Sequence, residues 1–195
     1  LSNWGIERSL RLAADLSRFW YLRGYWKEGR DWLEQVLSQA PPGDTSAEPA
    51  ARLRSARARA LYGAAWLMDE TGRDIPLYEQ SLSLCRELGD TWGTAFSLRG
   101  LGATTSYRGN PEQGEPLLEE SLALFRELGD PWGIALVLFS LAWVASNRDD
   151  NQRAQAMWDE SLGLFRQSGD RWGIAVVLGG LGYIARLRGH YQKAA

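Results

Sequence analysis

The side chains that most often catalyse reactions or bind metals are scarce in this chain of 195 residues. His190 is its only histidine and Cys85 its only cysteine, so these residues cannot form a histidine-based catalytic triad or a zinc site of cysteine and histidine. A lone cysteine also excludes a disulfide within the chain. We therefore expect no enzymatic activity, no metal and no other cofactor.

The charged residues argue against a nucleotide, nucleic acid or membrane ligand. Lys27 and Lys193 are the only lysines, and neither follows a glycine-rich phosphate loop of the GxxxxGK(S/T) type. The 22 basic and 24 acidic residues nearly cancel, so no overall field attracts nucleic acid or an anionic membrane. The longest apolar run, residues 134–145, is far shorter than the roughly 20 residues that span a bilayer. Because no N-terminal leader is visible either, we expect a cytoplasmic location.

The composition does offer recognition chemistry. The chain holds ten tryptophans, seven tyrosines and five phenylalanines, and all of its basic residues except Lys27 and Lys193 are arginines. Aromatic rings beside arginines can hold an acidic or aromatic partner by stacking, cation–π contacts and charge-assisted hydrogen bonds. Whether these side chains converge depends on the elements that carry them.

A repeat of 40 residues organises most of the chain. Residues 81–120 begin SLSLCRELGDTWG, residues 121–160 begin SLALFRELGDPWG, and residues 161–195 begin SLGLFRQSGDRWG. The first two copies agree at 16 of 40 positions, and the second and third agree at 18 of 35. A fixed period of this length predicts an array of similar structural units.

Each copy predicts two helices with a defined turn between units. A glycine that ends one helix is followed by an aspartate that caps the next, at Gly89-Asp90, Gly129-Asp130 and Gly169-Asp170. We expect a first helix, called helix A, over 91–108, 131–147 and 171–188, and a second, called helix B, that ends near residues 128 and 168. Small residues within helix A, such as Gly102 and Gly182, predict that a neighbouring helix packs against its backbone.

The pattern predicts a single repeat domain over 1–195. Its expected parts are an atypical N-terminal hairpin at 1–39, a loop at 40–49, a shortened repeat at 50–88, full repeats at 89–128 and 129–168, and a truncated repeat at 169–195.

These two-helix units resemble the tetratricopeptide repeat family. The resemblance is carried by the leucine and small-residue pairs of helix A, the glycine turns and the positions that open helix B: Leu98, Leu101-Gly102, Gly109, Leu118, Ser121-Leu122, Leu138, Leu141-Ala142, Ala154, Trp158, Ser161-Leu162, Leu178, Leu181-Gly182, Gly189 and Ala194. The unit departs from the common 34 residues of that family. The resemblance implies an all-α fold, a right-handed α-solenoid of antiparallel helix pairs that forms a TPR-like superhelix.

A narrower resemblance concerns the segments ESLALFRELGDPWGIA and LRLAADLSRFWYLRGYWKEGRDWLEQVL. They look like repeat arrays of bacterial signalling ATPases and transcriptional regulators of the NB-ARC or maltose-regulator type. In that group the repeats recognise a partner or an inducer beside an NTPase switch. No switch or DNA-binding motif occurs in this chain, so the resemblance implies a sister NTPase domain as a possible partner and no activity of these residues.

The tetratricopeptide resemblance also implies where a partner binds, because helix A of that family lines a concave groove. Positions that are identical in every copy serve the architecture, whereas the variable helix A positions are often aromatic. The predicted groove consists of Arg18, Tyr21, Tyr62, Trp66, Phe96, Arg99, Tyr107, Phe139, Trp143, Asn147, Tyr183 and Arg186. The alternative is that these rings only fill space between successive helices. We expect the tryptophans that recur at 92, 132 and 172 to pack at the repeat junctions.

Three functions remain open on this basis. The first is a non-catalytic scaffold that binds a peptide or partner domain in the groove, as the regulatory part of a larger signalling or transcription-regulating protein. The second is a small-molecule inducer sensor that controls an upstream NTPase switch, and the third is a spacer with an oligomerisation surface. The truncated last unit also predicts self-association, because Val177, Leu178, Leu181 and Ile184 lie on faces that helix B should cover.

Overall fold

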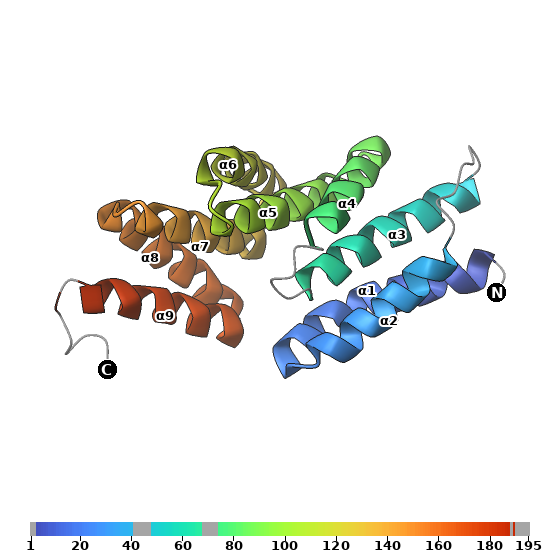
Figure 1. The fold of residues 1–195 in the computed structure, drawn as a ribbon, viewed down its shortest axis with the longest axis horizontal. Helices are drawn as coiled ribbons and strands as arrows, with labels where there is room; N and C mark the ends of the chain where they lie inside the picture. The colour runs from blue at the N-terminus through green and yellow to red at the C-terminus, as the bar shows by residue number, and fades with distance from the viewer. Residues whose placement is uncertain (1–2, 41–47, 68–73, 188, 190–195) are drawn as a thin grey trace. The chain divides into compact units, whose positions relative to one another are not determined.

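The computed structural model describes residues 3–40, 48–67, 74–187 and 189. These residues form nine helices and no strand within the described ranges, an all-α solenoid of antiparallel helix pairs as the repeat predicted (Figure 1). The chain divides into two compact units, Leu1–Leu101 and Gly102–Ala195, and each is described by itself. The described helices include none that is both long and apolar enough to span a membrane.

Unit 1 contains α1 (Asn3–Arg23), α2 (Trp26–Gln39), α3 (Glu48–Trp66), α4 (Asp74–Leu88) and the first part of α5 (Thr91–Tyr107). Helix α3 packs between α1 and α4, and α1 and α2 lie side by side (Figure 1). Leu10, Leu33 and Ala60 come from three different helices and are all fully buried. This core fixes the helix A faces of α1 and α3 relative to each other.

Unit 2 contains the end of α5, α6 (Pro111–Leu128), α7 (Pro131–Asn147), α8 (Asn151–Ser168) and α9 (Arg171–Leu187). Helix α7 contacts α6, α8 and α9, so it is the central helix of this unit (Figure 1). Its apolar side chains are buried on nearly every side, which explains why its sequence shows no polar face.

The turns between successive repeats follow the predicted glycine–aspartate pattern. Gly129 and Gly169 end α6 and α8 in the left-handed conformation, with φ of 63° and 67°, which glycine adopts without a steric penalty. Asp130 then accepts hydrogen bonds from the backbone N–H groups of Trp132 and Gly133 and so caps α7. The predicted helix breaks at these turns are confirmed.

Aspartate also links successive helix A elements. Asp170 caps α9 through the backbone N–H groups of Trp172 and Gly173, and its second oxygen accepts a hydrogen bond of 2.8 Å from the indole Nε1 of Trp132 on α7. The predicted role of Trp132 in packing at a repeat junction is therefore confirmed.

Two glycines of helix A make room for large rings from helix B. A Cβ atom at Gly100 would lie 2.2 Å from the ring of Tyr78 on α4, and one at Gly180 would lie 2.6 Å from the indole of Trp158 on α8. Both rings are buried. The middle repeat has Leu118 and Ser140 at the corresponding positions. A small residue in helix A thus accompanies a large ring in helix B.

The expectation of close helix packing is confirmed at Gly102 and lies outside the described residues at Gly182. A Cβ atom at Gly102 would meet the carbonyl oxygen of Gly114 at 2.7 Å, so the backbones of α5 and α6 do approach closely there. At the equivalent Gly182, by contrast, no heavy atom of the described residues lies within 4 Å of such a Cβ. The helix B that would pack there falls on residues 190–195, outside the described part of the chain.

The apolar face of the last repeat, which the sequence predicts to be exposed, is exposed only in part. Val177 and Ile184 are buried, because they lie on the side of α9 that faces α7 and α8, and Leu181 is half-buried. Leu178 remains 47% exposed. The exposed apolar surface of α9 is therefore smaller than the sequence suggested.

Candidate functional site

The predicted groove residues of unit 1 form an aromatic cluster. The ring of Tyr21 on α1 stacks on Trp66 of α3 with centroids 4.7 Å apart, and Trp66 meets Phe96 of α5 edge-on at 5.5 Å. Tyr62 lies 5.0 Å from Phe96, and Trp92 stacks on Phe96 at 5.2 Å. Helices α1, α3 and α5 therefore bring their variable aromatic positions together.

Depth separates these rings into two groups. Phe96 is only 1% exposed and Tyr62 is also buried, so both fill space between helices, as the alternative interpretation required. Burial raises the pKa of Tyr62 to about 12, although a hydrogen bond from Arg59 lowers it in part. Tyr21, Trp66 and Trp92 are half-buried. The part of this cluster that a partner can reach therefore consists of the Tyr21–Trp66 stack and Trp92.

Arg99 completes the cluster. Its guanidinium carbon lies 5.1 Å from the centroid of Phe96, and its positive charge is close enough to act on the phenols of Tyr78 and Tyr21. The positive charge lowers the pKa of Tyr78 and of Tyr21, but burial outweighs it and raises the pKa of Tyr78 to about 12. The Nε atom of Arg99 is buried and has no hydrogen-bond partner within the described residues.

Unit 2 carries a second group of predicted residues. Trp143 on α7 meets Tyr183 of α9 at a centroid distance of 5.6 Å, and Arg186 lies 5.5 Å above the ring of Tyr183. Phe139 packs edge-on against Trp143 at 6.4 Å. All three rings are half-buried and Arg186 is exposed. The face of α7 and α9 therefore offers a surface of rings and a cation.

Three predicted residues occupy more open positions. Arg18 on α1, Tyr107 at the end of α5 and Asn147 at the end of α7 are all exposed. They lie on helix A elements, as expected.

Sequence reasoning missed the residues that support these rings from below. Trp158 on α8 meets Trp143 edge-on at 5.2 Å, and its buried Nε1 has no hydrogen-bond partner among the described residues. Tyr78 on α4 occupies the corresponding position in unit 1, where its ring packs over Gly100 of α5. A signal for both was present, because each is a large ring opposite a helix A glycine, at a position where the middle repeat has Leu118.

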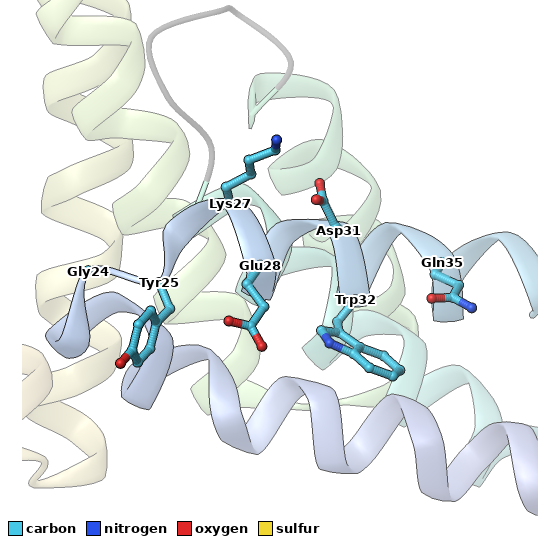
Figure 2. Close-up of a pocket in the computed structure, with 7 residues that line it drawn as sticks. All are labelled: Gly24, Tyr25, Lys27, Glu28, Asp31, Trp32 and Gln35. Atoms are coloured by element: carbon cyan, nitrogen blue, oxygen red, sulfur yellow. The ribbon is translucent and has the colours of Figure 1, made fainter.

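A cavity of about 530 Å³ lies along α2, away from the predicted groove. It is lined by Gly24, Tyr25, Lys27, Glu28, Asp31, Trp32 and Gln35. Tyr25, Glu28 and Trp32 project to one side of α2 and Lys27 and Asp31 to the other (Figure 2). The sequence analysis did not single out this surface.

Cys85 does not add a reactive group to these surfaces. The thiol is fully buried, and burial raises its pKa to about 11, so it stays protonated at neutral pH. Within the described ranges, no three histidine, cysteine, aspartate or glutamate side chains come together as metal ligands.

Comparison with protein families and curated proteins gives a partial match. No family model matches the chain. It is 25% identical over 107 residues to putative HTH-type transcriptional regulators of Mycobacterium bovis and Mycobacterium tuberculosis. The match covers 54% of this chain and 12% of each regulator, so the matched region is about an eighth of the length of those relatives.

Solved structures match over nearly the whole chain. A Rap protein in complex with competence and sporulation factor has a TM-score of 0.62 at 12% identity, over 96% of this chain and 61% of that protein. A putative kinesin light chain of Podospora anserina with nearly identical TPR-like repeats has a TM-score of 0.57 at 17% identity, over 97% of this chain and 90% of that protein. Together with the internal repeat, these matches show that the chain has a TPR-like helical-repeat fold.

Proposed function

We propose that the chain is a non-catalytic interaction domain that binds a peptide segment or a partner domain on the helix A side chains of its repeats. The observation that carries this proposal is the convergence of rings and an arginine on helix A faces within each unit. In unit 1, Tyr21 stacks on Trp66, and Phe96 links Trp66 to Arg99. In unit 2, Tyr183 contacts both Trp143 and Arg186. Half-buried rings beside arginines are typical of residues that dominate binding energy.

The comparisons favour a regulatory setting. The Rap structure holds a bound factor, and the curated relatives are named as transcriptional regulators. We therefore place the chain in the cytoplasm as the sensor part of a larger bacterial signalling or regulatory protein. A sister NTPase domain in the same protein is a further partner under this proposal.

The test compares two double variants that remove the same residue types. A peptide selected from a displayed random library on the wild-type chain is titrated by fluorescence anisotropy against W143A/Y183A and against the control Y25A/W32A on α2. Because truncation of a central aromatic costs about 2 kcal/mol or more, we expect Kd to rise about 30-fold or more for the first variant and to stay unchanged for the control.

Circular dichroism melts of both variants show whether a lost affinity reflects a lost fold. Equal Kd values for wild type and folded W143A/Y183A would remove the unit 2 surface from the proposal. A loss in the α2 control alone would move the binding site to that helix.

The alternative function is a small-molecule inducer sensor that controls an upstream NTPase switch. The stacked rings of Tyr21 and Trp66 favour it, since planar ligands stack on such surfaces. A thermal-shift screen of metabolites separates the two functions, because a ligand that binds only the folded state raises Tm. Self-association through α9 is a third contact that we propose, and Leu178 is its most exposed apolar residue.

A further inference from the structure

Helix α2 leaves two large rings in solvent beside the cavity that it lines. Tyr25 and Trp32 are each 52% exposed, although rings of this size stabilise a fold mainly when they are buried. They are seven residues apart and therefore lie on one face of the helix. Figure 2 shows both rings on the same side of α2, with Glu28 between them. Exposed rings gathered on one face are typical of a surface that binds a partner.

The turn before α2 holds the first of these rings in place. Gly24 has a φ of 75°, a left-handed conformation that lets the chain reverse between α1 and α2. The backbone N–H of Tyr25 then donates a hydrogen bond of 2.9 Å to the carbonyl of Trp20. The ring of Tyr25 lies 6.3 Å from the ring of Phe19 on α1. One wall of the surface is thus supported by a second helix.

The carboxylate between the two rings is not needed by the helix that carries it. Glu28 is exposed, and its carboxylate forms no ion pair or hydrogen bond within the part of the chain that the structure describes. A glutamate in the first turn of a helix can accept a hydrogen bond from the backbone N–H of the N-cap residue. Here that N–H belongs to Tyr25 and already donates to Trp20.

The charges of the cavity lining favour a positively charged ligand. Lys27 and Asp31 lie one turn apart on the other side of α2, so their opposite charges offset each other (Figure 2). Among the residues that line the cavity, Glu28 therefore supplies the net negative charge, and it does so on the side of the rings.

We propose that Tyr25, Glu28 and Trp32 form a site for an arginine side chain of a peptide segment. A guanidinium is planar and weakly hydrated, so it can stack on a ring while its parallel N–H donors bind both oxygens of a carboxylate. Seven residues rise by about 10.5 Å along the helix axis, so a cation midway is about 5 Å from each ring position, within the roughly 6 Å of a cation–π contact.

The openness of this surface favours arginine over other organic cations. The ammonium of lysine is compact and strongly hydrated, and half-exposed rings do not repay the loss of that hydration. A quaternary ammonium has no N–H to donate to Glu28 and is held best by rings that surround it. The proposal goes beyond the proposed function and does not rest on it, because α2 carries none of the groove residues.

The test titrates the ¹⁵N-labelled chain with blocked amino acids that differ in one side chain. The probes are N-acetylarginine N-methylamide, its citrulline analogue, which has nearly the same shape without the charge, and its lysine analogue. Binding is followed at the indole Nε1–H resonance of Trp32, which is the signal that W32F lacks. We expect the arginine probe to bind about tenfold more tightly than the citrulline probe, since only arginine offers a cation–π contact and a hydrogen bond between charged groups.

Substitutions assign this preference to the proposed site. E28Q should lower the affinity of the arginine probe to that of the citrulline probe, whereas the matched control D31N, on the other side of α2, should change it little. W32A should also weaken binding, and W4A is its control because Trp4 is an exposed indole of α1. These side chains are exposed, so the variants should fold, and melting curves check this.

Four outcomes would overturn the proposal. They are equal binding of the arginine and citrulline probes, no shift of the Trp32 indole in the millimolar range, a preference for arginine that survives in E28Q, and tighter binding of the lysine probe. Tighter binding of free arginine than of the blocked probe would overturn the assignment to a peptide segment. The proposed function is judged separately, because W143A/Y183A should bind the arginine probe as wild type does.

Discussion

At the scale of single residues, the buried phenols make stability depend on alkaline pH. Burial disfavours the phenolate and raises the pKa of Tyr62 and of Tyr78 from the usual 10.0 to about 12 in the folded chain. The unfolded chain therefore loses these protons first as pH rises. The stability that the neutral phenols contribute is fully present below pH 10 and is lost progressively up to about pH 12.

We predict that the free energy of unfolding in urea falls between pH 9.5 and 11, by about 1 kcal/mol for each of the two phenols. The stability of Y78F should fall less steeply with pH, because the substitution removes one of the two buried phenols. The same slope in Y78F and wild type would show that Tyr78 does not carry a raised pKa.

At the scale of helices, equivalent glycines differ in the contacts that the described residues make with them. Gly102 and Gly182 occupy the same place in α5 and α9, yet only Gly102 lies against another backbone within the described residues. Glycine inside a helix costs about 1 kcal/mol relative to alanine, unless close packing requires it. The packing at Gly102 offsets that cost, whereas no described contact does so at Gly182.

We predict opposite effects for the two alanine substitutions. G102A should destabilise the chain by about 1–3 kcal/mol, because the new methyl group meets the carbonyl of Gly114. G182A should stabilise it by up to about 1 kcal/mol through helix propensity. Both values come from urea denaturation, and a marked loss of stability in G182A would indicate that residues after α9 pack on this face.

At the scale of the whole chain, each repeat of such an array packs on its neighbours, so a terminal repeat has one face that no neighbour covers. On α9 this face is reduced to the exposed Leu178 and the half-buried Leu181, since Val177 and Ile184 turn toward the other helices of unit 2 and are buried. A single exposed leucine supports weak association rather than a stable dimer, which needs about 800 Å² per partner.

We predict that the sedimentation coefficient of the wild-type chain rises with protein concentration and that L178R reduces this rise. L128R is the matched control, because Leu128 is 43% exposed, close to the 47% of Leu178, but lies at the end of α6. It should behave as wild type does. A wild-type chain that remains monomeric at all concentrations would contradict the prediction.

Much of the fold could be read from the sequence, because the repeat places Gly129 and Asp130 where a left-handed turn and a helix cap are needed. The left-handed turn and the helix cap depend only on residues that are neighbours in the sequence. How deeply a ring is buried depends instead on how several helices pack together. Phe96 and Trp66 were both predicted to line the groove, yet of these two only Phe96 is buried. The support given by Tyr78 and Trp158 depends on contacts between helices that no single-helix pattern contains.

The exchange of size between Tyr78 and Gly100 also constrains how such an array can evolve. A lineage that enlarges position 100 first passes through a strained protein, because the new side chain enters the space of the ring. One that first shortens Tyr78 leaves a cavity that a later, larger residue at position 100 can fill. The middle repeat has the combination that such a path would produce. Its helix B has the smaller Leu118 where Tyr78 lies in the preceding repeat, and its helix A has Ser140 where Gly100 lies. The order of substitutions is therefore restricted across helix boundaries. A larger residue can replace the glycine in a helix A only after the ring that packs on it from helix B has become smaller.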